Sequence, residues 1–234
     1  MMKVAVTGAS GRLGKELLRR PWAGCELVPL TRADADLSDA EATQRLLQRV
    51  RPQVVVHTAS ATDLVRCERD RQYGWDNIAL PALHVAQGCI ATGARLVHVS
   101  TDYVFSGNEP VHPIPPETRP DPTHYYAVCK VAAEMAARAV PDHLVVRTTM
   151  KSREPWKHDA APQDMWISHS YYDEVAEVLE RVTLEGRRGI LHFGARDVNV
   201  YEFAREGRPT VKPVLRADIK TLQLPGDIRL KVNL

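Results

Sequence analysis

The chain has 234 residues, which suits one domain, or one domain with a small lobe attached. Apolar residues make up 44% of it, enough for a sizeable core, and 31 basic residues nearly balance 29 acidic ones. The resulting net charge of +2 gives no indication of a nucleic-acid or membrane-surface partner, and no run of eighteen apolar residues predicts a membrane span.

Two further features favour a cytoplasmic protein. Residues 1–7 lead directly into an apolar strand pattern, without the charged leader and longer apolar stretch of an export signal. The four cysteines, Cys25, Cys67, Cys89 and Cys129, are scattered without a CxxC pair, so reduced thiols are expected rather than disulfides or a zinc site. None of the nine histidines has HxH or HxxxH spacing, so no metal is expected.

The first 150 residues alternate between short β-rich runs and helical patterns. The predicted strands are Lys3–Thr7, Glu26–Thr31, Val54–Thr58, Arg95–Thr101 and Leu144–Thr149. The predicted helices are Arg12–Arg20, Ser38–Val50, Asn77–Thr92 and Thr123–Ala139. This alternation, with short links and nearly continuous apolar strands, predicts an α/β fold with a Rossmann-type, doubly wound parallel sheet covered on both faces. Ser38 and Glu41 have the spacing of a capping box at the start of the second helix.

After Thr149 the alternation stops. The segment Lys151–Ser170 has two tryptophans, prolines and mixed charges with no clear period, and is predicted to be irregular. A helix is expected at Tyr172–Glu185, a strand at Gly189–Phe193 and a short helix near Tyr201–Glu206, followed by an extended tail. The predicted organisation is a sheet domain over residues 1–150 and a small C-terminal lobe over residues 151–234, partly interleaved with it.

The strongest motif is a glycine-rich turn between the first strand and the first helix. Gly8 permits a tight turn, Gly11 lets the backbone approach a pyrophosphate, and Gly14 lets the helix pack closely on the sheet. Placed in the first strand-to-helix turn, the motif is typical of a dinucleotide-binding site. The residues expected around the phosphates are Gly8, Ser10, Gly11, Arg12, Leu13 and Gly14.

The ends of the second and third strands are expected to contact the rest of the cofactor. Arg32, after the second strand, offers a forked donor to a ribose 2′-phosphate, which favours NADP(H), with NAD(H) also possible. A solvated surface arginine is the alternative. Asp36 and Leu37 are placed to flank the adenine. At the end of the third strand, Thr58, Ala59 and Ser60 are small enough to leave room for the cofactor.

A second motif suits carbonyl reduction. Tyr126 and Lys130 are four residues apart, so both project from one helix face, and Thr101 ends a strand at the carboxyl edge of the sheet. A lysine cation beside a tyrosine favours the phenolate. Tyr126 would therefore donate a proton to the alkoxide formed by hydride transfer, and Thr101 would hydrogen-bond the same oxygen. Tyr125 is a rival proton donor, but it lacks a lysine four residues on.

The order of these motifs resembles a known family. The matching stretches are Val6–Gly14, Asp34–Asp39, Val54–Glu68, Asn77, Val99–Gly107 (VSTDYVFSG) and Tyr126–Lys130. Through them the chain resembles the extended short-chain dehydrogenase/reductases, and within these the dTDP-4-dehydrorhamnose reductase branch, for which VSTDYVFSG is the most specific stretch. The resemblance covers residues 3–150 well and continues weakly beyond them.

The resemblance implies an NAD(P)H-dependent oxidoreductase that reduces the 4-keto group of a nucleotide-linked deoxysugar. It implies that Thr101, Tyr126 and Lys130 are the catalytic triad. It also implies that Asn77, Tyr126 and Lys130 contact the cofactor. Asp102 and Tyr103 would face the sugar. A homodimer is expected by analogy.

Departures from the family leave alternatives open. Members have a longer segment where this chain has Lys151–Ser170, so the C-terminal substrate lobe is expected to be small and shortened. Trp156 and Trp166 could stack on a base, but packing of the lobe is the favoured interpretation. Cys129 is expected to be a small buried side chain rather than a redox-sensitive thiol. The alternatives to a reductase are a non-catalytic, cofactor-binding regulatory subunit and a sugar-nucleotide epimerase of the same class.

Overall fold

The computed structural model describes residues 1–234, and its central feature is a mostly parallel sheet. The strands of its N-terminal part are β1 (Met2–Thr7), β2 (Cys25–Leu30), β3 (Val54–His57), β4 (Arg95–Thr101) and β5 (His143–Lys151). They lie in the order β2-β1-β3-β4-β5, and β8 (Gly189–Phe193) continues the sheet beside the first half of β5. The predicted α/β class and parallel sheet are confirmed.

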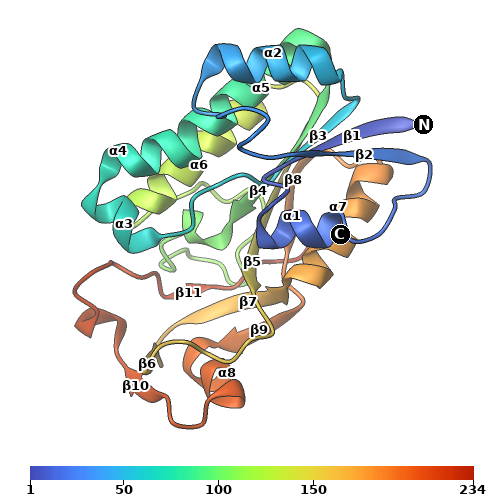
Figure 1. Ribbon diagram of the computed structural model, residues 1–234. Coiled ribbons are helices and arrows are strands. Elements are labelled where there is room, and N and C mark those ends of the chain that lie inside the picture. The colour runs from blue at the N-terminus through green and yellow to red at the C-terminus, as the bar shows by residue number, and fades with distance from the viewer.

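Helices cover both faces of this sheet. The helices are α1 (Arg12–Leu17), α2 (Ala40–Val50), α3 (Leu64–Arg69), α4 (Arg71–Gly74), α5 (Leu80–Thr92), α6 (Tyr125–Arg138) and α7 (Tyr172–Leu184). Figure 1 shows α2, α5 and α6 on one face and α1 and α7 on the other. The strand β1 shows why two cores form, because Val4 and Val6 point to the α1–α7 side and Ala5 to the α2–α5 side. No helix combines the length and apolar character that crossing a membrane would need.

The prediction for the start of α2 was wrong. Asp39, not Ser38, is the N-cap, and its carboxylate accepts a hydrogen bond from the Ala42 amide. The Ser38 hydroxyl donates instead to Asp36, which also accepts from the Ser38 amide. The two residues are adjacent and both suit a cap, and the aspartate carboxylate is the acceptor that reaches the free amides.

The helix predicted over Asn77–Thr92 begins earlier than expected. The chain runs through α3 and α4 into a π-helical turn, Trp75–Ala79, which continues without a break into α5. Asp63 and Asp70 cap α3 and α4 with their carboxylates, a signal in the sequence that the predicted elements did not use. Pro81 follows the π-helical turn and has no amide proton to continue its hydrogen bonds, and the Asn77 carbonyl oxygen accepts from the Ala61 amide instead.

The segment expected to be irregular contains strands, so that prediction was wrong. The additional strands are β6 (Ala160–Pro162), β7 (Trp166–Tyr171), β9 (Arg196–Asn199), β10 (Lys212–Val214) and β11 (Asp227–Ile228). The second half of β5 pairs with β7, which also pairs with β9 and β11. In β7 the buried polar side chains Ser168 and Ser170 hide the apolar period, and their hydroxyls are hydrogen-bonded to Asp197 and to the Ala195 amide.

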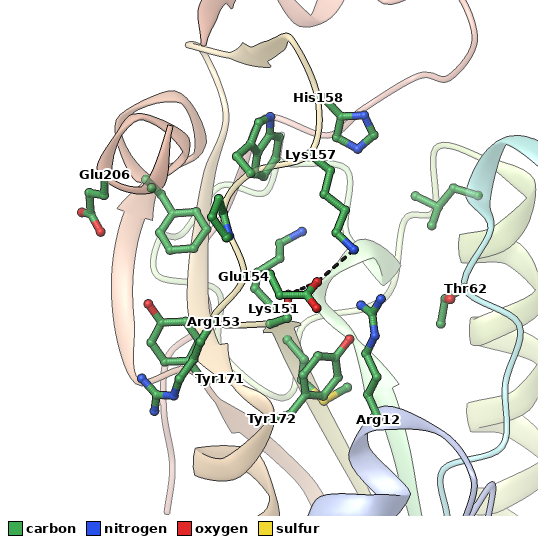
Figure 2. A pocket seen from close by; sticks show the side chains of 17 residues that line it. Arg12, Thr62, Lys151, Arg153, Glu154, Lys157, His158, Tyr171, Tyr172 and Glu206 are labelled. Atoms are coloured by element: carbon green, nitrogen blue, oxygen red, sulfur yellow. Dashed lines mark hydrogen bonds and ion pairs between the residues drawn. The ribbon is translucent and has the colours of Figure 1, made fainter. Parts of the chain in front are cut away.

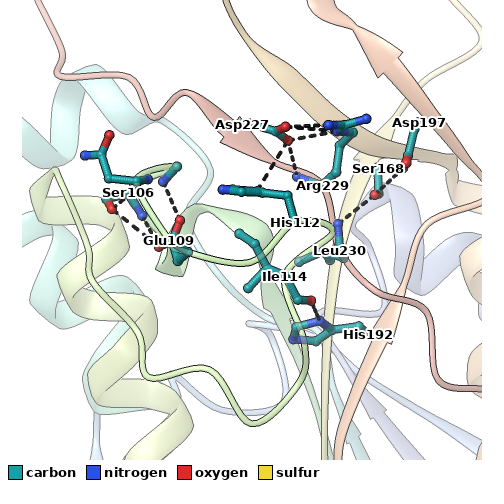
Figure 3. Close-up of polar contacts among 12 residues, drawn as sticks. Ser106, Glu109, His112, Ile114, Ser168, His192, Asp197, Asp227, Arg229 and Leu230 are labelled. Carbon is teal, nitrogen blue, oxygen red and sulfur yellow. Dashed lines mark hydrogen bonds and ion pairs between the residues drawn. The ribbon is translucent and has the colours of Figure 1, made fainter.

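The lobe is formed by β6, β9, β10, β11 and helix α8 (Val200–Gly207), below the main sheet in Figure 1. Polar contacts tie it to the loop that follows β4 (Figure 3). His112 Nδ1 lies 3.8 Å from the Asp227 carboxylate, and the Ile114 amide donates to the Arg229 carbonyl oxygen at 2.7 Å. The Leu230 amide donates to Ser168 of β7 at 2.8 Å. The C-terminal tail, which was predicted to be extended, therefore runs beside β7. Earlier in the chain, α7 and β8 pack against and extend the main sheet.

Candidate active site

The first candidate site lies where the order of the strands reverses, between β1 and β3. Ligands of doubly wound sheets bind at such switch points, outside the carboxyl ends of the strands. A cavity of about 520 Å³ opens there, and we call it the switch-point cavity. Ten of the residues predicted to contact a cofactor line it: Gly8, Ser10, Gly11, Arg32, Asp36, Leu37, Thr58, Ala59, Ser60 and Asn77.

Close backbone packing explains two of the turn glycines. Gly8 has φ +67°, and a Cβ atom there would lie 2.8 Å from the Ala59 amide nitrogen. At Gly14 a Cβ would lie 2.3 Å from the Gly8 carbonyl oxygen, closer than any real contact. Larger residues would therefore push α1 and the β3 end away from the turn and distort the floor of the switch-point cavity.

The other turn residues point elsewhere. Leu13 and Gly14 are buried beneath the turn, and Leu13 packs in the α1–α7 core. Arg12 is exposed and lines a second cavity, which adjoins the lobe. The structure therefore gives Leu13 and Gly14 a supporting position, and it takes Arg12 out of the switch-point cavity where it was expected.

At the far end of the switch-point cavity, Arg32 is held by a hydrogen bond from its guanidinium to Asn77 Oδ1 at 3.1 Å. Two hydrogen bonds from Ser38 lower the pKa of Asp36, and the charge of Arg32 lowers it further. The predicted set missed Arg66, Tyr73 and Asp76, which come from α3, α4 and the π-helical turn. The Arg66 guanidinium stacks on the Tyr73 ring, 3.7 Å from its centroid.

The structure brings the three predicted catalytic residues into one buried group. Thr101 ends β4, and Tyr126 and Lys130 lie one helical turn apart on the inner face of α6. All three side chains are less than a tenth exposed. Tyr125, the rival proton donor, lies outside this group, against the cluster that contains Cys67 and Cys129.

Lys130 is held in place by the strand beside it. Its ammonium donates a hydrogen bond to the Val99 carbonyl oxygen at 2.8 Å. Burial lowers the pKa of Lys130 to about 8, although the negative charge of Glu134 raises it. Lys130 is therefore a cation at neutral pH and loses its charge within the ordinary working range of enzymes.

Tyr126 is a neutral phenol in this environment. Burial raises the pKa of Tyr126 well above its usual value, and the charge of Asp102 raises it further, while a hydrogen bond with Thr101 lowers it. A tyrosine in this state holds a proton that it can give to a developing alkoxide.

Asp102 lies behind Thr101 instead of facing an open cavity, which differs from the substrate contact that the resemblance implied. Its side chain is 1% exposed, and its two carboxylate oxygens accept hydrogen bonds from the hydroxyls of Thr101 and Thr149. The Tyr103 amide donates to Thr101 Oγ at 3.2 Å. Together these bonds direct the Thr101 hydroxyl proton to Asp102, while the Thr101 oxygen accepts from the Tyr103 amide. Tyr103 itself is partly buried and its ring meets the Tyr126 ring edge-on at 6.4 Å.

The second cavity, about 610 Å³, lies between the glycine-rich turn and the lobe, and we call it the lobe cavity. Figure 2 shows side chains from both parts of the chain around it. Trp156 lines this cavity and also donates from Nε1 to the Ala160 carbonyl, which anchors its ring in the lobe. Trp166 does not line it, and its ring lies under the Arg229 guanidinium. The packing interpretation therefore fits Trp166, and Trp156 both packs and faces the cavity.

Cys129 and two of the histidines lie in the interior of the protein. Cys129 is fully buried, and burial raises its pKa to about 11, as expected for a small interior side chain. His57 and His98 stack inside the sheet with their centroids 5.4 Å apart, and burial lowers the pKa of His57 to about 3.

The chain matches the family model described as the RmlD substrate binding domain over residues 2–151. The chain belongs to this family. The resemblance seen in the motifs is thereby confirmed, and the matched residues include both the glycine-rich turn and the Tyr126–Lys130 pair.

Individual members of the RmlD family agree with this assignment. The chain is 36% identical to a dTDP-4-dehydrorhamnose reductase of Mycobacterium tuberculosis over 152 residues, which is 62% of this chain and 49% of that protein. It therefore spans about half the length of the curated relatives it matches.

Solved structures resemble the chain over nearly its whole length. The dTDP-4-dehydrorhamnose reductase of Clostridium acetobutylicum matches with TM-score 0.90 and 24% identity, over 99% of this chain and 90% of that one. The Bacillus anthracis enzyme of the same name, in complex with NADP, matches with TM-score 0.89 and 23% identity, over 100% and 92%. At these identities the likeness shows the fold, including the part after residue 151.

Proposed function

We propose that this protein is an NAD(P)H-dependent reductase of the 4-keto group of a nucleotide-linked deoxysugar. The observation that carries the proposal is the buried group of Thr101, Tyr126 and Lys130, in which neutral Tyr126 hydrogen-bonds with Thr101 and cationic Lys130 lies one turn further along α6. The group lies at the carboxyl end of the sheet, as the cavities on either side of the glycine-rich turn do. Relatives of the RmlD family whose names describe the same reduction add support.

The residues divide the chemistry among them. A nicotinamide cofactor, held by the residues that line the switch-point cavity, would supply the hydride for the carbonyl carbon. Tyr126 gives its phenolic proton to the carbonyl oxygen as negative charge develops there, so the product is an alcohol. The Thr101 hydroxyl, which donates to Asp102 in the absence of substrate, turns to donate to the same oxygen, and the Lys130 cation stabilises the phenolate left on Tyr126. Tyr126 is protonated before the reaction mainly because burial raises the pKa of its phenol, and burial raises the pKa of the neighbouring Asp102 as well.

The switch-point cavity suits the dinucleotide, because Gly8 and Gly11 line it without Cβ atoms and Gly14 lets α1 pack against the turn beneath it. We propose NADP(H) as the preferred cofactor, since Arg32, one of the two arginines that line the cavity, follows the second strand and is held beside Asn77.

Replacement of Arg32 by alanine is expected to weaken NADPH binding by about 10- to 100-fold, the loss of one charge-assisted contact to the 2′-phosphate. NADH lacks this phosphate, so its affinity should change less than about twofold. Calorimetric titration of the purified protein with each cofactor measures both. Arg45→Ala removes an arginine outside the cavity and serves as the matched control. An equal loss for the two cofactors would refute the assignment of Arg32.

The rate of reduction is expected to fall above about pH 8. The pKa of Lys130 lies near 8, so its cation is present below that pH and is lost above it, while the pKa of Tyr126 is raised and its proton remains. The measurement is the rate of NADPH oxidation from about pH 6 to about pH 10. In Lys130→Arg, which keeps its charge over this range, the fall should move to higher pH. An alkaline limb unchanged in this variant would show that another group titrates.

The direct test is NADPH oxidation with dTDP-4-dehydrorhamnose as substrate. Stoichiometric oxidation of NADPH with formation of the alcohol supports the reductase. Tightly retained cofactor with interconversion of sugar epimers and no net oxidation indicates the epimerase instead. Cofactor binding without conversion of any keto-sugar indicates the regulatory subunit, although such a protein has no need of the buried Tyr126–Lys130 group.

A further inference from the structure

The lobe cavity is lined by two cations that form no direct ion pair with a carboxylate. Arg12 enters it from the glycine-rich turn and Lys151 from the end of β5, and neither forms a hydrogen bond or an ion pair through its side chain. Arg153, which also lines the cavity, is different because it pairs with Asp173 at 2.7 Å. In Figure 2, Arg12, Lys151 and Lys157 all point into the space around Glu154.

Lys151 lies next to the proposed reaction centre. It is two residues beyond Thr149, so both side chains project from the same face of β5. Thr149 donates to Asp102, which in turn accepts from Thr101. Burial lowers the pKa of Lys151 and the charge of Asp102 raises it, which places the ammonium within electrostatic reach of that carboxylate. Its nitrogen also lies 5.9 Å from the centroid of the Trp156 ring.

Glu154 is the carboxylate that forms an ion pair with one of these cations, whereas Asp102 is bonded to Thr101 and Thr149, and Glu206, which also lines the cavity, pairs with Arg196. It belongs to the short segment between β5 and β6, and it accepts hydrogen bonds from Ser152 and an ion-pair contact from Lys157 at 2.9 Å. The charges of Lys157 and Arg12 both lower its pKa. Its side chain is 60% exposed, so its position depends on attraction by the cations rather than on packing.

We infer that Arg12, Lys151 and Lys157 form a site for the diphosphate group of the substrate, and that Glu154 occupies this site until the ligand displaces it. The inference rests on the proposed function, since it names the group by which that substrate is held.

The charge of the site favours a diphosphate over a single carboxylate. With Glu154 displaced, three cations face the cavity, and a single carboxylate would leave two of them uncompensated. A diphosphate carries at least two negative charges on oxygens that can reach separate donors. Two residues along a strand advance about 7 Å, so the backbone position of Lys151 lies about one sugar ring beyond that of Thr149. This spacing suits a diphosphate attached to a sugar whose far side is reduced.

The test is calorimetric titration of the NADPH-saturated protein with dTDP and, separately, with inorganic pyrophosphate. Lys151→Met is expected to weaken dTDP binding by about tenfold, because it removes one charge-assisted contact. Glu154→Gln is expected to tighten it by about threefold, because the competing carboxylate loses its charge. Glu154 is exposed, so this variant should fold normally. Lys212→Met, an exposed lysine of the lobe outside the cavity, is the matched control and should bind dTDP like the unmodified protein.

Pyrophosphate that competes with dTDP, together with opposite effects of the Lys151 and Glu154 substitutions, supports the site. Binding of dTDP that is unaffected by pyrophosphate and by Lys151→Met overturns it, as does weaker binding in Glu154→Gln. The turnover assay separates this result from the proposed function. If the protein reduces the keto-sugar but Lys151→Met has no effect, the proposed reductase function is supported and the diphosphate site is refuted. If dTDP binds at the site but no keto-sugar is reduced, the site is supported and the reductase function is refuted.

Discussion

Tyr126→Phe is expected to lower the rate of keto-sugar reduction by about 10²- to 10⁴-fold, the usual contribution of a positioned proton donor. The phenol oxygen is the only atom that the substitution removes, and the proposed mechanism draws its proton from that oxygen. NADPH affinity should change little, because Tyr126 is not among the residues that line the switch-point cavity. Rates are measured by NADPH oxidation, and affinity by calorimetric titration.

The neighbouring residue provides the control for this prediction. Tyr125→Phe removes the same atom from the adjacent side chain of α6, which packs against the cluster of Cys67 and Cys129. Its rate should stay within about twofold of the unmodified protein. If Tyr126→Phe retained full activity, or if Tyr125→Phe lost it, the assignment of the proton donor would be wrong.

Arg147→Met is expected to destabilise the protein by about 3–5 kcal/mol, because it leaves a buried carboxylate without its partner. The side chains of Arg147 and Glu134 are 1% and 3% exposed. Arg147 donates to both carboxylate oxygens of Glu134, at 3.0 and 2.8 Å, and the Ser100 hydroxyl donates to the same group at 2.6 Å. This network connects the C-terminal half of α6, which carries Lys130 one turn earlier, to β4 and β5.

Urea denaturation measures the loss as a change in the free energy of unfolding. Arg45→Met breaks the exposed pair with Glu41 and should cost less than about 0.5 kcal/mol. The double variant Arg147→Met, Glu134→Leu removes both charges and should recover much of the stability lost in the single variant. A single variant as stable as the unmodified protein would mean that Glu134 finds other partners, or protonates at little cost.

The sequence by itself determined the parallel sheet, most of the residues that line the switch-point cavity, and the catalytic group of Thr101, Tyr126 and Lys130. Val4 to Val6 belong to a short apolar run whose alternating side chains suit a sheet covered on both faces. The glycines at positions 8, 11 and 14 predict the phosphate-binding turn. Tyr126 and Lys130 meet on one helix face because of a spacing of four residues. These features depend on near neighbours in the chain, which is why their patterns can be recognised without a structure.

Only the tertiary structure decided the lobe and the electrostatics. The strand β7 forms because β5, β9 and β11, distant in sequence, supply its hydrogen-bond partners, so its own residues carry no clear period. In the same way, Asp102 turns inward because Thr149 on another strand offers a donor, and Arg12 faces the lobe because the short segment carrying Glu154 folds towards it. Contacts between distant segments set the orientation and charge of these side chains, and no local pattern in the sequence records such contacts.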